Sequence, residues 1–250
     1  MDIGKCFKDA WGLFRLDWGP LVVTALIAAV IVGVVNVVVG LAVGGSIGAI
    51  NAGSFTGLAM GSALFSMVLL MVVAVVVYAW MYAVTFHMIL RRVRERRAAE
   101  YADLQSFDQI GAFAVAAVIL GIIIGIGYII FVIPGLILTT IWLYALPLIG
   151  DRRIGVGEAM SESKAMAARP GYFTTFVTWL VGAIVAAVIL GILSIIPVVG
   201  VILGLVAAPL GVAYMLSMYF QVNGEGHLVD AAIGQAPAPP GAGGGGRGHR

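Results

Sequence analysis

The sequence predicts an all-α integral membrane protein, a bundle of six transmembrane helices arranged as three hairpins. Hydrophobic residues make up 62% of the 250-residue chain and charged residues only 10%, against about a quarter charged in an average soluble domain. All Asp, Glu, Lys and Arg residues lie outside three long uncharged blocks. Each block is long enough for two membrane crossings, which gives the six helices.

The uncharged blocks also set the orientation. They cover residues 18–90, 109–150 and 170–224, and are 73, 42 and 55 residues long. A crossing needs about 20 apolar residues, so each block holds two crossings and a turn. One crossing per block would put the basic segments alternately on opposite sides, which the positive-inside rule disfavours. Two crossings place all 14 Lys and Arg residues in the cytoplasm, in what we expect to be a bacterial inner membrane.

The first element is predicted to be a short amphipathic helix within residues 1–18. Its apolar and polar residues separate onto two faces at helical spacing. We therefore expect this segment to lie in the membrane interface, ending near the Trp-Gly-Pro at residues 18–20. The apolar face holds Ile3, Cys6, Phe7, Ala10, Trp11 and Phe14, and the polar face holds Asp2, Lys5, Lys8, Asp9 and Arg15.

The transmembrane domain is predicted over residues 19–230. External connections are expected in the Gly- and Ser-rich segment 44–57 and in two short turns that contain proline, at 133–135 and 197–200. The charged linkers 91–108 and 151–169 are expected in the cytoplasm. Residues 231–250 are rich in Gly and Pro and predict a disordered cytoplasmic tail. The spans are expected at about 21–43, 61–90, 112–132, 136–150, 172–195 and 201–222.

A weak internal repeat supports the three hairpins. Trp-Met-Tyr-Ala-Val at residues 80–84 recurs as Trp-Leu-Tyr-Ala-Leu at 142–146, a period of 62 residues, and each copy precedes a basic cluster. Coincidence within an alphabet dominated by Val, Ile, Leu, Ala and Gly is the alternative explanation.

Short motifs occur at the ends of the predicted spans: Trp-Gly-Leu-Phe at 11–14, Trp-Gly at 18–19, Ile-Pro-Gly at 133–135, Ala-Leu-Pro-Leu at 145–148 and Gly-Glu-Ala-Met at 157–160. Together they resemble a bacterial family of polytopic membrane proteins similar to the membrane domain of glycerophosphodiester phosphodiesterases. The resemblance covers about residues 1–230 and implies a six-helix bundle. The catalytic part of such a phosphodiesterase is a soluble barrel, for which this chain has no room, so no catalytic residue is implied.

The residue types that catalysis requires are sparse. The three histidines, His87, His227 and His249, have no metal-ligand spacing with one another or with an acid. Cys6 is the only cysteine, which excludes an internal disulfide. We expect no catalytic residue, no metal and no cofactor. The basic residues flank the membrane segments without forming a nucleic-acid motif, so no nucleic-acid partner is expected.

Two sets of residues are candidates for binding or packing roles. Five arginines within seven positions at a membrane exit would attract anionic lipid headgroups, although fixing the topology is the favoured explanation of them. The neutral polar Asn36 and three tryptophans about 10 residues from the nearest arginine are expected inside the membrane, as a core layer or as the wall of a small chamber. The arginines are Arg91, Arg92, Arg94, Arg96 and Arg97, and the tryptophans are Trp80, Trp142 and Trp179.

The uncharged spans argue against an ion-coupled transporter, which needs intramembrane ionisable residues. The sequence favours a non-enzymatic membrane protein with an accessory, scaffold or lipid-interacting role. A channel or facilitator for an uncharged small solute is the alternative, lined by Asn, Ser and Thr, and an enzyme is the third choice. Membrane lipids are the expected partner, and a second copy or another membrane protein stays open.

Cysteine-accessibility labelling tests the predicted orientation. Cysteines replacing Glu95 or Met160 should be protected from an impermeant thiol reagent added outside, because the positive-inside rule places both linkers in the cytoplasm. A cysteine replacing Asn51 should react. Labelling at 95 or 160 together with protection at 51 would overturn the orientation.

Overall fold

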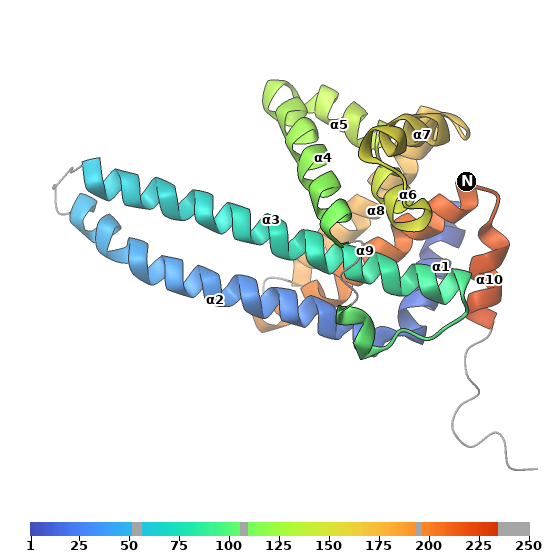
Figure 1. Cartoon of the computed structure of the whole chain (residues 1–250), viewed down its shortest axis with the longest axis horizontal. Coiled ribbons are helices and arrows are strands. Elements are labelled where there is room, and N and C mark those ends of the chain that lie inside the picture. The colour runs from blue at the N-terminus through green and yellow to red at the C-terminus, as the bar shows by residue number, and fades with distance from the viewer. Residues whose placement is uncertain (52–56, 106–109, 194–196, 235–250) are drawn as a thin grey trace, which may run out of the picture.

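The described residues of the computed structural model, 1–51, 57–105, 110–193 and 197–234, form helices joined by short connections (Figure 1). This confirms the all-α class. Six stretches of the described residues are long and apolar enough to cross a membrane, so the chain is a multi-pass membrane protein. The elements are α1 (Ile3–Leu16), α2 (Trp18–Asn51), α3 (Gly57–Arg94), the 3-10 helix η1 (Tyr101–Gln105), α4 (Ile110–Ile130), α5 (Val132–Ile141), α6 (Ala145–Arg152), α7 (Val156–Ala168), α8 (Tyr172–Leu193), α9 (Pro197–Val222) and α10 (Gly226–Gly234).

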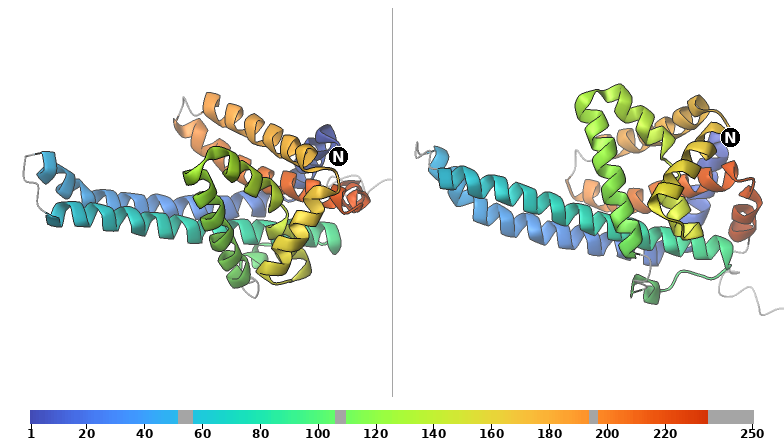
Figure 2. Two further views of the ribbon diagram at one scale, coloured as in Figure 1. Left: turned by 90° about the horizontal axis from the view of Figure 1, so that it is seen from above. Right: turned by 45° about the horizontal axis from the view of Figure 1, so that its top comes forward.

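The first hairpin is longer than predicted. Helices α2 and α3 pack along each other and project well beyond the other helices (Figures 1 and 2). They contain 34 and 38 residues, roughly 51 and 57 Å at 1.5 Å per residue. The predicted loop at 44–57 is helical up to Asn51, and residues 52–56 lie outside the described part. Because a hydrocarbon core is only about 30 Å thick, the hairpin must tilt or extend past it.

The second hairpin turns two residues earlier than predicted. Phe131 alone is extended between α4 and α5, with φ −157° and ψ 143°. Pro134 and Gly135, predicted to form the turn, lie in the first turn of α5 instead. Proline is tolerated there because the first turn of a helix needs no partner for its N–H groups. Gly135 lets the two helices approach, since a Cβ there would lie 2.5 Å from Cγ of Tyr128.

The predicted fourth span is broken into α5 and α6. The chain turns at residues 142–144, and a hydroxyl from α7 satisfies the backbone at the break. The Ser163 hydroxyl donates to the Ile141 carbonyl oxygen at 2.8 Å and accepts from the Tyr144 N–H at 3.1 Å. A helix break inside a membrane protein is tolerated only where such groups are paired.

The ends of the chain pack together. A helix, α1, forms within the segment 1–18 that is predicted to be an amphipathic helix, and it contacts α9 and α10. Asp9, predicted on its polar face, is buried, whereas Trp11, predicted on its apolar face, is 51% exposed. The interfacial position of α1 stays a prediction. Residues 231–234, predicted as part of the tail, complete α10, in which Val229 and Ala232 are buried, and residues 235–250 lie outside the described part.

The close contact at Gly135 gives a stability prediction. Gly135→Ala should destabilise the protein by about 1–3 kcal/mol, because the new Cβ overlaps the Tyr128 ring. The effect should disappear in a Tyr128→Ala background, where the overlapping atoms are gone. Thermal unfolding in detergent measures both changes.

Gly125→Ala is the matched control in the same hairpin, since nothing lies within 4 Å of a Cβ at that position. This variant should keep or slightly raise the melting temperature, because alanine favours a helix more than glycine does. Equal losses in Gly135→Ala and Gly125→Ala would contradict the packing assigned to the turn.

Candidate functional site

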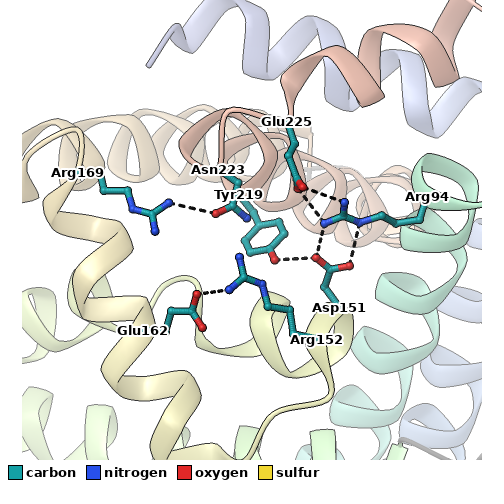
Figure 3. Close-up of polar contacts among 8 residues, drawn as sticks. All are labelled: Arg94, Asp151, Arg152, Glu162, Arg169, Tyr219, Asn223 and Glu225. Carbon is teal, nitrogen blue, oxygen red and sulfur yellow. Dashed lines mark hydrogen bonds and ion pairs between the residues drawn. The ribbon is translucent and has the colours of Figure 1, made fainter.

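Ion pairs join the last turn of α3 to α6 and to the connection between α9 and α10, and join α6 to α7 and α1 to α10. We call this region the charged end of the bundle. At its centre the Arg94 guanidinium lies between the carboxylates of Asp151 and Glu225 (Figure 3). Arg94 comes from α3, Asp151 from α6, and Glu225 from the connection between α9 and α10. Three segments far apart in the sequence therefore meet at one guanidinium.

The Arg94 guanidinium forms a bidentate pair with each of the two carboxylates. Arg94 donates to the two oxygens of Asp151 at 3.0 and 2.6 Å, and to the two oxygens of Glu225 at 3.0 and 2.8 Å. The Tyr219 hydroxyl donates to Oδ2 of Asp151 at 2.7 Å, and the guanidinium carbon of Arg94 lies 5.2 Å from the Phe220 ring centroid. The side chain of Asp151 is only 8% exposed, so these bonds replace the water that its charge has lost.

Two further contacts extend the network along the same end. Arg152 of α6 pairs with Glu162 of α7, and Nη1 of Arg169 donates to Oδ1 of Asn223 at 3.4 Å. Figure 3 shows these side chains converging from separate helices. These contacts connect α3, α6, α7 and α9, and their role is to stabilise the fold.

Four of the five arginines that the sequence offers for anionic lipid have carboxylate partners within the protein. Besides Arg94, Arg91 pairs with Asp103 and Glu95, Arg92 with Asp17, and Arg97 with Glu100. Arg92 and Asp17 are both largely buried. The lipid role of this cluster stays a prediction, and these pairings favour its alternative as structure and topology.

The predicted intramembrane residues lie in different surroundings. Asn36 is exposed on α2, and its amide donates to the Val32 carbonyl of the same helix at 2.8 Å. Trp80, Trp142 and Trp179 are half-buried and pack against the main core cluster. Trp142 lies in the break between α5 and α6, whereas its repeat counterpart Trp80 lies within α3. A shared tryptophan layer stays a prediction.

A groove that the sequence reasoning missed runs between α8 and α9 and is closed by α1 and α3. Its volume is about 620 Å³, and its lining is apolar apart from the tips of a few aromatic side chains. Trp11, Tyr82, Val185 and Ile189 line it and remain 37–51% exposed, so the groove is open at the molecular surface. A second apolar hollow, of about 450 Å³, lies between α5 and α8.

Small residues create the groove. Gly182, Ala183 and Ala186 on α8 face Ala207 and Gly211 on α9. Gly182 admits the Tyr214 ring, which would lie 2.5 Å from a Cβ at that position, and the Tyr214 hydroxyl donates to the Thr178 carbonyl at 2.7 Å. Small residues spaced three and four positions apart are visible in the sequence and indicate a close approach of two helices. This spacing does not distinguish a groove from close helix packing.

Buried polar groups lie where α1 packs on α9. The Ser217 hydroxyl donates to Oδ2 of Asp9 at 3.0 Å, and burial raises the pKa of this carboxyl above its ordinary value. Burial also raises the pKa of the Cys6 thiol to about 11, so the thiol is neutral and unreactive at pH 7. Lys5 and Asp230 join α1 to α10 with a 2.8 Å ion pair.

Comparisons with protein-family models, curated proteins and solved structures find no match. The family resemblance therefore rests on the sequence motifs alone. Within the described ranges, no three His, Cys, Asp or Glu residues lie close enough to hold a metal ion.

The charged network gives a second stability prediction. Asp151→Asn should destabilise the protein by about 1–3 kcal/mol, because Arg94 loses a bidentate partner and Tyr219 loses its charged acceptor. Partial exposure of Arg94 keeps the loss below that of a fully buried pair. The melting temperature should fall by roughly 2–4 °C per kcal/mol.

Arg97→Gln is the control for general charge effects. It removes an ion pair in which both side chains are about half exposed, so no measurable change in melting temperature is expected. A decrease as large as that of Asp151→Asn would show that net charge matters and that the network geometry does not.

Proposed function

We propose that this chain is a non-enzymatic membrane protein of the bacterial cytoplasmic membrane that holds a lipid in the α8–α9 groove and serves as an accessory or scaffold component. The observation that supports this function is the groove itself. Its volume of about 620 Å³ lies within the ~300–1,000 Å³ typical of small-molecule sites. Its walls are apolar and it is open to the side, so its occupant must be apolar over most of its length.

The groove is continuous with a surface that faces lipid. The exposed side chains of Val185, Val188 and Ile189 on α8 are 37–52% accessible, and these residues fall within a predicted span. A lipid could therefore enter sideways from the bilayer without crossing a polar barrier. Because lipid tails are already in an apolar medium, the groove gains little from hydrophobic transfer, and selectivity must come from shape and from the headgroup.

The alternative of a channel for an uncharged solute is less well supported. Such a channel would use hydroxyl and amide groups as its lining, but four of the threonine hydroxyls within the described spans are already bonded to carbonyls of their own helices. Thr24 donates to Pro20, Thr139 to Gly135, Thr140 to Leu136 and Thr178 to Thr174. Asn36 likewise donates to its own helix and faces outward.

Filling the groove tests the proposed function. Gly211 lines it, and nothing lies within 4 Å of a Cβ at that position, so Gly211→Leu should occupy the groove without a steric clash. We expect the wild type purified in mild detergent to retain one lipid per chain in native mass spectrometry. Gly211→Leu should lose it and keep its melting temperature.

Gly33→Leu is the matched control, since Gly33 is exposed on α2 with nothing within 4 Å of a Cβ. This variant should retain the lipid. Equal retention by Gly211→Leu and the wild type would overturn the proposed site. A lipid-free dimer that becomes monomeric in Gly211→Leu would assign the groove to a second copy of the chain.

A further inference from the structure

We infer that the groove binds an anionic phospholipid, whose phosphate is held by Lys8 and Arg15 on α1 and whose acyl chain lies between α8 and α9. The inference rests on the proposed function and specifies the lipid class and the residues that select it. It also moves anionic-lipid recognition from the arginine cluster at the end of α3 to the first helix.

Lys8, Trp11 and Arg15 form an exposed stripe on α1, which we call the α1 stripe. They are three and four residues apart, so they lie on one side of the helix. Lys8 and Arg15 are separated by seven residues, roughly 10 Å along the axis. Trp11 lies between them along the helix. Basic residues beside an indole are typical of a helix that meets the headgroup region of a membrane.

The α1 stripe adjoins the groove directly. Trp11 belongs to both, and Phe7, one turn earlier, also lines the groove. The Phe7 ring packs on Tyr214 of α9, with ring centroids 4.8 Å apart. A headgroup on the stripe would therefore sit at the mouth of the groove, with its glycerol backbone next to the two aromatic rings.

The remainder of the groove runs away from the α1 stripe in the direction that an acyl chain needs. From Met218 its lining continues along α9 to Leu203, fifteen residues or roughly 22 Å. Along α8 it runs from Trp179 to Ile189, ten residues or roughly 15 Å. These lengths reach at least the middle of a hydrocarbon core about 30 Å thick.

The two cations of the stripe are available for a ligand. No hydrogen bond or ion pair joins either side chain to another residue in the part of the chain that the structure describes. The contrast with the charged network is direct, because Lys5, Arg91, Arg92, Arg94, Arg97 and Arg152 each pair with a carboxylate. A lipid phosphate would meet unpaired charge at Lys8 and Arg15 without first breaking an internal ion pair.

The expected selectivity follows from the number of cations. Each basic residue near a membrane surface favours an anionic headgroup by a factor of about five, and salt reduces this where the charges are exposed. Two cations would give a factor of about 25, and screening of the exposed charges at 0.15 M salt lowers the expected preference for an anionic over a zwitterionic lipid to roughly tenfold. The groove determines where the acyl chain binds, and the two cations determine the preference for an anionic headgroup.

Photolabelling in nanodiscs tests this inference. The probes are phosphatidylglycerol and phosphatidylcholine carrying the same acyl chain with a mid-chain diazirine. Labelling of groove residues 182–189 is measured by mass spectrometry relative to the exposed α2 residues Val34 and Val37. In the wild type, the phosphatidylglycerol probe should label the groove about tenfold more than the phosphatidylcholine probe.

Two double variants with the same change in net charge distinguish a specific binding site at Lys8 and Arg15 from a general attraction of anionic lipid to positive charge. Lys8→Gln with Arg15→Gln should reduce the preference to about twofold or less while both probes still label the groove. The control is Arg96→Gln with Lys164→Gln, which removes one exposed Arg and one exposed Lys outside the groove. It should keep the tenfold preference.

The outcomes distinguish this inference from the proposed function. Equal labelling of the wild-type groove by both probes, or equal loss in the two double variants, would overturn the anionic site and leave the groove as a lipid site. Groove labelling no greater than that of α2 with either probe, together with no effect of Gly211→Leu, would overturn both.

Discussion

The hydrocarbon interior cannot solvate a charge or an unpaired peptide group, and the structure depends on this constraint throughout. It keeps Asp, Glu, Lys and Arg out of the three uncharged blocks and concentrates charge at their ends. Arg94 shows the consequence for packing, because its guanidinium joins the carboxylates of Asp151 and Glu225 from two other segments. Charges excluded from the spans thus become the polar contacts that align the helix ends.

The same constraint decides where the backbone can be irregular. The fourth span can break at residues 142–144 only because Ser163 of α7 pairs with both sides of the break. The Ser163 hydroxyl therefore stabilises the backbone of another segment and not its own helix. Helix α7 carries exposed charged residues as well as the buried Ser163, and the Ser163 hydroxyl bonds to the backbone at the break between α5 and α6.

In the function proposed here, ion pairing and lipid recognition compete for the same basic residues. Arginines at the end of α3 are held by internal carboxylates, whereas Lys8 and Arg15 of α1 lie exposed beside an apolar groove. Proximity to a membrane alone does not make a cation a lipid ligand. What matters is whether the protein has already neutralised it, and whether an adjacent surface can hold the apolar part of the lipid.

The sequence by itself determined the class, the six spans and the separation of charged and uncharged segments, because the hydrophobic effect acts on whole stretches of chain. It also predicted a helix at the start of the chain. Tertiary structure decided the details: the break at Trp142, the burial of Asp9, the partners of the arginines and the groove lined by Gly211. These depend on contacts between residues distant in sequence, such as Asp9 with Ser217 and Arg94 with Glu225, and local composition or periodicity does not encode such pairings.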